Sequence, residues 1–215
     1  MVTLRKMDTK NFFSNEIILN IYKNKRRYND FLDIFNIDGT GKKALDVGCS
    51  AGGFSMRLKE LGFDVVGIDI SEKAIDMAKK LSKNIRYYVA DITEWKIKEK
   101  FDYIFGMFDL LSFIMKKELR IKALKNMIYM LKKGGKIYFT FIKPNSKTYI
   151  KYFLYKIKNP SSEFLDTEEM HFKTKESVLK HNTTKKEIID YCRILKIPIF
   201  YILEMNNIFI IIIKK

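Results

Sequence analysis

The stretch that most constrains this chain is a short apolar run that leads into a cluster of small residues, Ala44-Leu45-Asp46-Val47-Gly48-Cys49-Ser50-Ala51-Gly52-Gly53-Phe54-Ser55. The apolar part is typical of a buried strand, and Phe54, Leu58 and Leu61 then follow at helical spacing. A glycine turn before a helix brings backbone N–H groups close to a ligand, because glycine has no Cβ to keep the ligand away. The stretch therefore predicts a strand, a turn and a helix that together bind a small polar molecule.

The spacing of the glycines separates two kinds of ligand. The dinucleotide fingerprint Gly-x-Gly-x-x-Gly needs a middle glycine, where the pyrophosphate touches the backbone. This chain has Gly48, Ser50 and Gly53 at those places, and Asp46 precedes them. A carboxylate beside a diphosphate would bring like charges together. We therefore expect a ligand with a cation or ammonium group and keep an NAD-dependent oxidoreductase as an alternative.

A second acid follows the next predicted strand. Residues 65–68 are wholly apolar, as in a parallel strand that is buried on both faces, and Asp69 ends the run. Asp69 lies about 20 residues after Gly48, where an acid at the carboxyl edge of a strand accepts hydrogen bonds from ribose hydroxyls. Asp69 therefore indicates that a nucleoside binds, without choosing between NAD and another cofactor.

The run from Asp46 to Gly52 resembles the first motif of the class I S-adenosylmethionine-dependent methyltransferases, an acid followed by Gly-x-Gly-x-Gly, with Ser50 in place of the middle glycine. Asp91-Ile92 after the third predicted strand is similar to the part of these enzymes that contacts adenine. Residues 101–109 and 131–138 are similar to two later motifs of the family. The resemblance covers about residues 42–215.

The resemblance implies a Rossmann-like α/β fold: a seven-stranded sheet of order 3-2-1-4-5-7-6 with helices on both faces. Residues 206 and 207 leave room only for a hairpin turn between the last two predicted strands, so strand 7 should run antiparallel to its neighbour. We expect one domain over residues 1–215, with helices over the active site in residues 1–41. Residues 143–183 break the βα rhythm after strand five, and we interpret them as a substrate cap.

The resemblance further implies the cofactor S-adenosyl-L-methionine, with S-adenosyl-L-homocysteine as its product. Asp46 and the backbone of the turn would hold the methionine end, Asp69 the ribose and Asp91 the adenine amine. The predicted cofactor-binding residues, all near the carboxyl ends of the first four strands, are Asp46, Gly48, Cys49, Gly52, Asp69, Ile70, Asp91, Ile92 and Met107.

The activity that the resemblance implies is methyl transfer to an oxygen or nitrogen atom of a small-molecule acceptor, by in-line displacement. Ser112-Phe113 stands where many small-molecule members carry an acid and a histidine, so the usual base is absent. The remaining candidates for a catalytic base are Asp109, His171 and His181. Aromatic residues that could line the acceptor site, or simply pack under the cap, are Tyr28, Tyr149 and Tyr152. No metal site is expected.

Two alternatives to this activity stay open. The sequence Gly-Gly-Phe-Ser after the first motif is similar to that of RNA 2′-O-methyltransferases, and Asp109, Lys143, Lys25 and Glu204 would then form a catalytic set. A catalytically silent nucleoside-binding or interaction module is the other alternative. Methyl transfer, RNA modification and simple binding all require the same cofactor site.

Composition restricts the partners and the setting. The formal charge is +16, but only seven of the 41 basic residues are arginine, the residue that favours phosphate and base recognition. We interpret the charge mainly as background composition, with an anionic acceptor or nucleic acid as alternatives. The polar first ten residues, the two cysteines and the absence of a long apolar run predict a cytoplasmic protein with no membrane partner, either a monomer or a homodimer.

Overall fold

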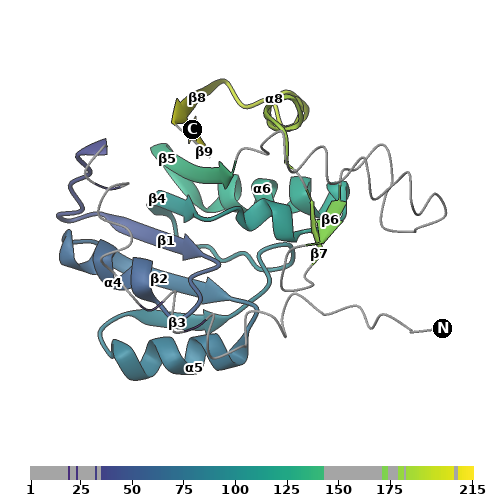
Figure 1. Ribbon diagram of the computed structural model, residues 1–215. Helices are drawn as coiled ribbons and strands as arrows, with labels where there is room; N and C mark the ends of the chain where they lie inside the picture. Colours follow the sequence, from purple (N-terminus) through teal and green to yellow (C-terminus); the bar gives the residue numbers. More distant parts are fainter. Residues whose placement is uncertain are drawn as a thin grey trace, which may run out of the picture.

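The computed structural model describes residues 35–142, 171–173, 179–181, 183–205 and 208–215, together with Leu19, Lys23 and Leu32. Seven strands form one sheet in the order β3-β2-β1-β4-β5-β9-β8 (Figure 1). Their bounds are β1 (Lys43–Val47), β2 (Asp64–Asp69), β3 (Arg86–Val89), β4 (Phe101–Gly106), β5 (Leu131–Ile142), β8 (Ile199–Met205) and β9 (Ile208–Lys214). Since β8 and β9 are the predicted strands six and seven, the predicted order is confirmed.

The direction of the strands also agrees with the prediction. Strands β1 to β5 run parallel to one another, whereas β9 pairs antiparallel with both β5 and β8. Only residues 206 and 207 separate β8 from β9, too few for the crossover that a parallel pair would need. The last strand therefore lies inside the sheet, and β8 forms its edge.

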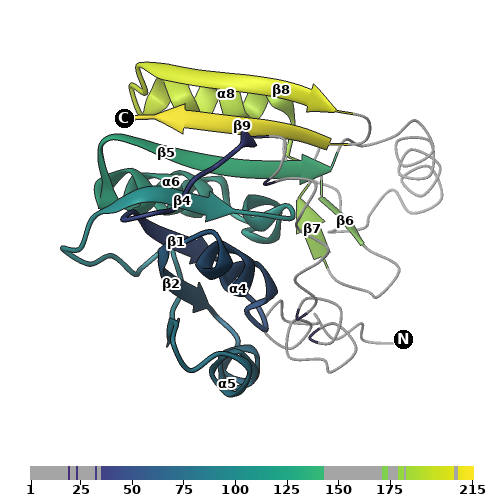
Figure 2. The same ribbon diagram turned by 90° about the vertical axis from the view of Figure 1, so that its left-hand side faces the viewer.

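Helices cover both faces of this sheet (Figure 2). They are α4 (Gly53–Glu60), α5 (Glu72–Leu81), α6 (Lys117–Met130) and α8 (Lys185–Ile194), with a short 3₁₀ helix, η2 (Leu110–Phe113). Two of these helices begin at capping side chains: the Ser71 hydroxyl accepts from the Ala74 N–H, and the Thr184 hydroxyl accepts from the Glu187 N–H. None of the described helices is both long and apolar enough to cross a bilayer.

The pleat of the strands divides the core into two layers. In β1, Ala44 packs with α4 and α5 on one face, while Leu45 packs with α6 and α8 on the other. Phe105 and Ile104 alternate in the same way on β4. Because both faces are covered, β1 and β2 carry almost continuous apolar runs, with Asp46 and Asp69 at or near their carboxyl ends.

Strand β5 bends near its start. Strand β5 starts directly after α6, and its pairing with β4 jumps from Leu131 to Lys136. Gly134 lies between them at φ 77° and donates its N–H to the Lys215 carbonyl at 2.7 Å. The glycine therefore lets the chain bend without interrupting the strand.

A short antiparallel ribbon of β6 (His171–Lys173) and β7 (Leu179–His181) was not predicted. Both views place it beyond the carboxyl ends of β4 and β5 (Figures 1 and 2). The ribbon belongs to the predicted cap over 143–183. The rest of the cap, apart from Thr183, and almost all of the predicted N-terminal helices lie outside the described residues, so the division into these parts stays a prediction.

Candidate functional site

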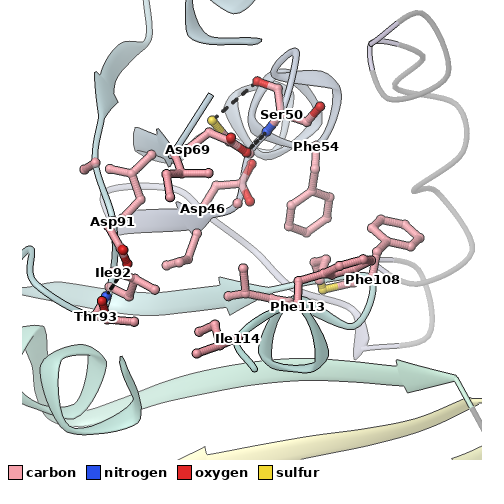
Figure 3. Close-up of a pocket in the computed structure, with 18 of the residues that line it drawn as sticks. Asp46, Ser50, Phe54, Asp69, Asp91, Ile92, Thr93, Phe108, Phe113 and Ile114 are labelled. Carbon is pink, nitrogen blue, oxygen red and sulfur yellow. Dashed lines mark hydrogen bonds between the residues drawn. The ribbon is translucent and has the colours of Figure 1, made fainter. Parts of the chain in front are cut away.

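A cavity of about 290 Å³ opens at the carboxyl ends of the parallel strands (Figure 3). Carboxylates from three consecutive strands line it, together with apolar and aromatic side chains. The lining residues are Asp46, Val47, Gly48, Cys49, Ser50, Phe54, Ile68, Asp69, Ile70, Ala90, Asp91, Ile92, Thr93, Met107, Phe108, Leu110, Phe113, Ile114, Met115 and Leu119. Eight of the nine predicted cofactor-binding residues are among them, and Gly52 is not.

Asp46, near the end of β1, is the most deeply buried of the three acids, with 2% of its surface exposed. The Ser55 hydroxyl on α4 donates to its Oδ2 at 2.6 Å. Burial raises the pKa of Asp46 to about 7, against the effect of the Ser55 hydrogen bond and with a further contribution from the nearby charge of Asp69. A cation bound here would therefore stabilise a carboxylate that is costly to ionise without it.

Asp69, at the end of β2, holds the glycine turn and the start of α5 in place. Its Oδ2 accepts the Ser50 N–H and its Oδ1 accepts the Ser71 N–H, each at 2.9 Å. Burial raises the pKa of Asp69 in spite of these two bonds. Each carboxylate oxygen can accept a second hydrogen bond, so Asp69 can also bind hydroxyl groups in the cavity.

The N–H groups of the turn are used inside the fold, which corrects our expectation that they contact the ligand. Those of Gly48 and Cys49 both donate to the Ile68 carbonyl, at 2.8 and 2.9 Å. The Gly52 N–H donates to the Cys49 carbonyl at 2.9 Å, and that of Ser50 is taken by Asp69. The turn therefore offers no row of these donors to a diphosphate.

The two predicted glycines have different roles. Gly48 lines the cavity at φ 74°, and a Cβ there would lie 2.8 Å from the Leu110 side chain across the opening. Gly52, at φ 83°, faces away from the cavity, and a Cβ there would lie 2.6 Å from the Tyr87 hydroxyl. Gly52 thus allows the turn to pack against β3, which is a structural reason for a glycine rather than a contact with a ligand.

Ser50 explains how the turn forms without its middle glycine. It adopts φ 48°, a left-handed conformation that glycine takes without strain and other residues rarely adopt. The Asp69 carboxylate accepts the Ser50 N–H and so holds this conformation. Cys49 beside it is buried, and burial raises the pKa of its thiol, which does not favour a nucleophilic thiolate.

The third acid lies at the opposite end of the cavity from the aromatic rings described below (Figure 3). Asp91 is exposed, and its Oδ1 accepts the Thr93 N–H at 2.8 Å, which fixes the turn after β3. Ile92, 6% exposed, and Ile70, 40% exposed, line the cavity together with Asp91 and add apolar surface to it. This end of the cavity can hold a flat apolar ring with one hydrogen-bond donor.

Three aromatic side chains gather on the other side of the cavity: Phe54, Phe108 and Phe113 (Figure 3). None of the three is predicted as a site residue, because in the sequence they show only that they lie close to the motifs. Phe108 and the next residue, Asp109, both adopt left-handed conformations, at φ 54° and 62°. Thr140 on β5 holds this strained turn, because its hydroxyl accepts the Phe108 N–H at 2.7 Å and its carbonyl accepts the Asp109 N–H at 2.9 Å.

The candidate bases lie away from this cavity or are not described at the side chain. Asp109 is 2% exposed and does not line it. His181 is buried, and its Nε2 lies 2.6 Å from Glu187 Oε2. His171 pairs with His181 across β6 and β7, where only its backbone is described. The structure thus favours a structural role for His181, and the assignment of a base stays a prediction.

Other predicted residues lie outside the described residues: Tyr28, Tyr149, Tyr152, Lys25 and Lys143. Glu204, the remaining member of the set for RNA methylation, is on the edge strand β8 and pairs with Lys185 at 2.7 Å. Neither Glu204 nor Asp109 lines the cavity, so the described half of that set gives it no support.

The charges of the cavity fit a nucleoside with an ammonium group better than a dinucleotide. Three carboxylates line it, and among its described lining residues there is no lysine or arginine. A diphosphate would need cations or free N–H donors, and the turn does not provide the latter. An ammonium group and ribose hydroxyls need acceptors instead, which Asp46 and Asp69 offer. The residues present therefore fit the cofactor that the sequence predicted.

Comparison with known proteins agrees with this description. Residues 44–135 match the family model of a methyltransferase domain. A ubiquinone biosynthesis O-methyltransferase of Coxiella burnetii is 37% identical over 115 residues, which are 51% of this chain and 47% of that protein. The chain thus matches less than half of the length of this relative.

Two solved structures are similar over most of their length. A methyltransferase from Methanosarcina mazei, described as S-adenosylmethionine-dependent, superposes with a TM-score of 0.68 at 22% identity, covering 85% of this chain and 96% of that one. The N-methyltransferase NodS of Bradyrhizobium japonicum, solved with S-adenosylhomocysteine, gives 0.62 at 17% identity, covering 94% and 93%. At these identities the likeness concerns the fold. Residues 44–135 thus match a methyltransferase domain, and the described fold is the Rossmann-like fold of S-adenosylmethionine-dependent methyltransferases.

Proposed function

We propose that this protein binds S-adenosylmethionine in the described cavity and transfers its methyl group to an oxygen or nitrogen atom of a small molecule. The observation that carries the proposal is the set of carboxylates at the ends of β1, β2 and β3, which line one cavity without a described cationic side chain. Asp46 would accept the ammonium group, Asp69 the ribose hydroxyls and Asp91 the adenine amine. Ile70 and Ile92 would flank the adenine ring.

The bound cofactor supplies a methyl group on a positively charged sulfur, which needs little further activation. The work left to the protein is to align the acceptor atom with the methyl carbon and to exclude water. The aromatic side of the cavity, formed by Phe54, Phe108 and Phe113, suits this task, because it offers an apolar wall beside the acids. We therefore place the acceptor on that side.

The O-methyltransferase name of the Coxiella relative supports an oxygen acceptor, and the NodS name supports nitrogen. The described residues that line the cavity include no lysine or arginine that would attract an anionic acceptor. A neutral or cationic acceptor with an apolar body fits the described part of the site better. Aromatic faces also attract cationic groups, such as a protonated amine.

Two measurements test the proposal. Titration calorimetry with S-adenosylhomocysteine should give one site per chain, and detection of S-adenosylhomocysteine formed from S-adenosylmethionine should identify acceptors in a panel of phenols, amines and RNA transcripts. Turnover with a phenol or an amine supports the proposal. Binding without turnover on any acceptor would favour a silent nucleoside-binding module, turnover on transcripts alone would favour RNA methylation, and no binding would contradict the placement of the cofactor.

A further inference from the structure

A charged residue interrupts the apolar face of α6. The residues of α6 that are buried are Arg120, Ala123, Leu124, Asn126, Met127 and Met130, and the Arg120 side chain is 0% exposed. A buried guanidinium is costly unless its donors are bonded and its charge is balanced. The partners of Arg120 therefore indicate why a charge is kept in this core.

Two of these partners belong to the wall of the cavity. Arg120 Nη1 donates to the carbonyl oxygens of Ile114 and Met115, at 2.7 and 2.6 Å. Both residues line the cavity in the segment between η2 and α6. This segment has no strand or helix of its own to hold it, so the guanidinium supplies backbone bonds that regular structure would otherwise provide.

The charge of Arg120 is balanced from α8, an element that does not line the cavity. Arg120 Nη2 pairs with Glu187 Oε1 at 3.0 Å, and Nε donates to the Tyr191 hydroxyl at 2.7 Å. The Tyr191 hydroxyl in turn donates to Glu187. Burial alone would raise the pKa of Glu187, but hydrogen bonds from His181 and Tyr191 and the charge of Arg120 lower it to about 2. Glu187 thus stays ionised and holds the guanidinium in one orientation.

A second residue of α6 holds a second part of the wall. Asn126 Nδ2 donates to the Ile92 carbonyl at 2.8 Å and to the Thr93 carbonyl at 3.1 Å. Ile92 and Thr93 also line the cavity, and Ile92 belongs to the same hydrophobic cluster against which Ile114 packs. One helix therefore fixes, through buried side chains, two loops that belong to the same end of the site.

We propose that Arg120 and Asn126 are positioning residues that set the width of the adenine end of the cavity, and that Glu187 and Tyr191 of α8 hold Arg120 in place. The proposal assigns a role to α8 that no residue of the cavity reveals. The placement of adenine rests on the proposed function, whereas the hydrogen bonds from Arg120 to residues 114 and 115 do not depend on it.

The test uses Arg120→Lys, which keeps the charge but lacks the planar fork that reaches two carbonyls, Tyr191 and Glu187 together. The matched control is Arg193→Lys on the exposed face of α8, where the arginine contacts only Asp190 among the partners described. In the ligand-free proteins, ¹³C-methyl spectra of methionine should show the Met115 resonance displaced in Arg120→Lys and unchanged in the control. Met56 on α4 should keep its position in both.

Binding gives the second measurement. Adenosine and S-adenosylhomocysteine should each bind Arg120→Lys about tenfold more weakly than they bind the unmodified protein, and the number of sites should not change. The factor should be the same for both, because only the nucleoside that they share contacts the adenine end of the cavity. A residue that merely stabilises the fold would lower the number of sites and the melting temperature instead. If Arg120→Lys does not fold, Tyr191→Phe removes one support of Arg120 and should give the same pattern at a smaller size.

A folded variant with the native Met115 resonance and native affinities would overturn the proposal. If the unmodified protein binds neither ligand, the proposed function fails, and the Met115 resonance alone then decides whether Arg120 positions the wall. A displaced Met115 resonance together with unequal losses of affinity for the two ligands would show that residues 114 and 115 do not contact adenine. That result would also overturn the proposal.

Discussion

Cofactor affinity should depend on pH through Asp46. The carboxyl has a pKa of about 7 in the ligand-free protein, because it is buried and lies near a second acid. Its proposed partner is an ammonium group, which requires the ionised form. Half of the molecules carry that form at pH 7 and about 1% at pH 5, so the apparent Kd should rise about fifty-fold between these values. The raised pKa of Asp69 acts in the same direction.

Calorimetry with S-adenosylhomocysteine measures both parts of this effect. At pH 7 binding should release about half a proton, seen as a binding enthalpy that differs between phosphate and Tris buffers. Asp46→Asn should bind more weakly, with no proton release from this site and a much flatter pH profile. Asp69→Asn removes the like charge beside Asp46 and should move the midpoint to lower pH. A native affinity that stays constant from pH 7 to 5, without proton release, would refute the pairing of Asp46 with the ammonium group.

Three further predictions concern Asp46, Gly52 and Asp91. Without ligand, the raised pKa of Asp46 stabilises the fold below about pH 4, and this contribution is lost as the pH rises through about 7, so Asp46→Asn should flatten the pH dependence of urea unfolding over that range. Gly52→Ala should lower the free energy of unfolding by about 2–4 kcal/mol, because the new Cβ meets Tyr87, whereas Gly41→Ala, at φ 69° with no atom within 4 Å, should cost only about 1–2 kcal/mol. Asp91→Ala should weaken S-adenosylhomocysteine binding by about 1.5–3 kcal/mol in calorimetry, while Asp76→Ala on the exposed side of α5 should leave it unchanged.

Much of the fold could be predicted, because local signals and the global pattern agree. Strands β1 and β2 read as apolar runs with an acid at or near their carboxyl ends, and the N-caps at Ser71 and Thr184 stand directly before helical patterns. The two-residue gap before β9 fixed its direction. The ribbon of β6 and β7 escaped prediction because its strands have three residues each, too few to show a period of two.

The site was predicted less completely, because its details depend on contacts between distant residues. The acids Asp46, Asp69 and Asp91 follow strands and could be found from the sequence, but the use of the turn's N–H groups by Ile68 and Asp69 could not. The positioning role proposed for Arg120 has one signal in the sequence, a charged residue at a position where the helical spacing of α6 predicts an apolar one. Its partners on α8 lie about 70 residues later in the sequence, which no local pattern connects.

The antiparallel insertion of β9 has a consequence for synthesis of the chain. The edge of β5 that β9 will cover carries unpaired backbone groups until residue 214 is made, about 70 residues after β5 is complete. At ~5–20 residues per second, this edge stays open for on the order of 4 to 15 s. During that interval the growing polypeptide presents an apolar template to any other unfinished strand nearby, so its yield in cells should depend on translation speed and on chaperones that shield nascent edges.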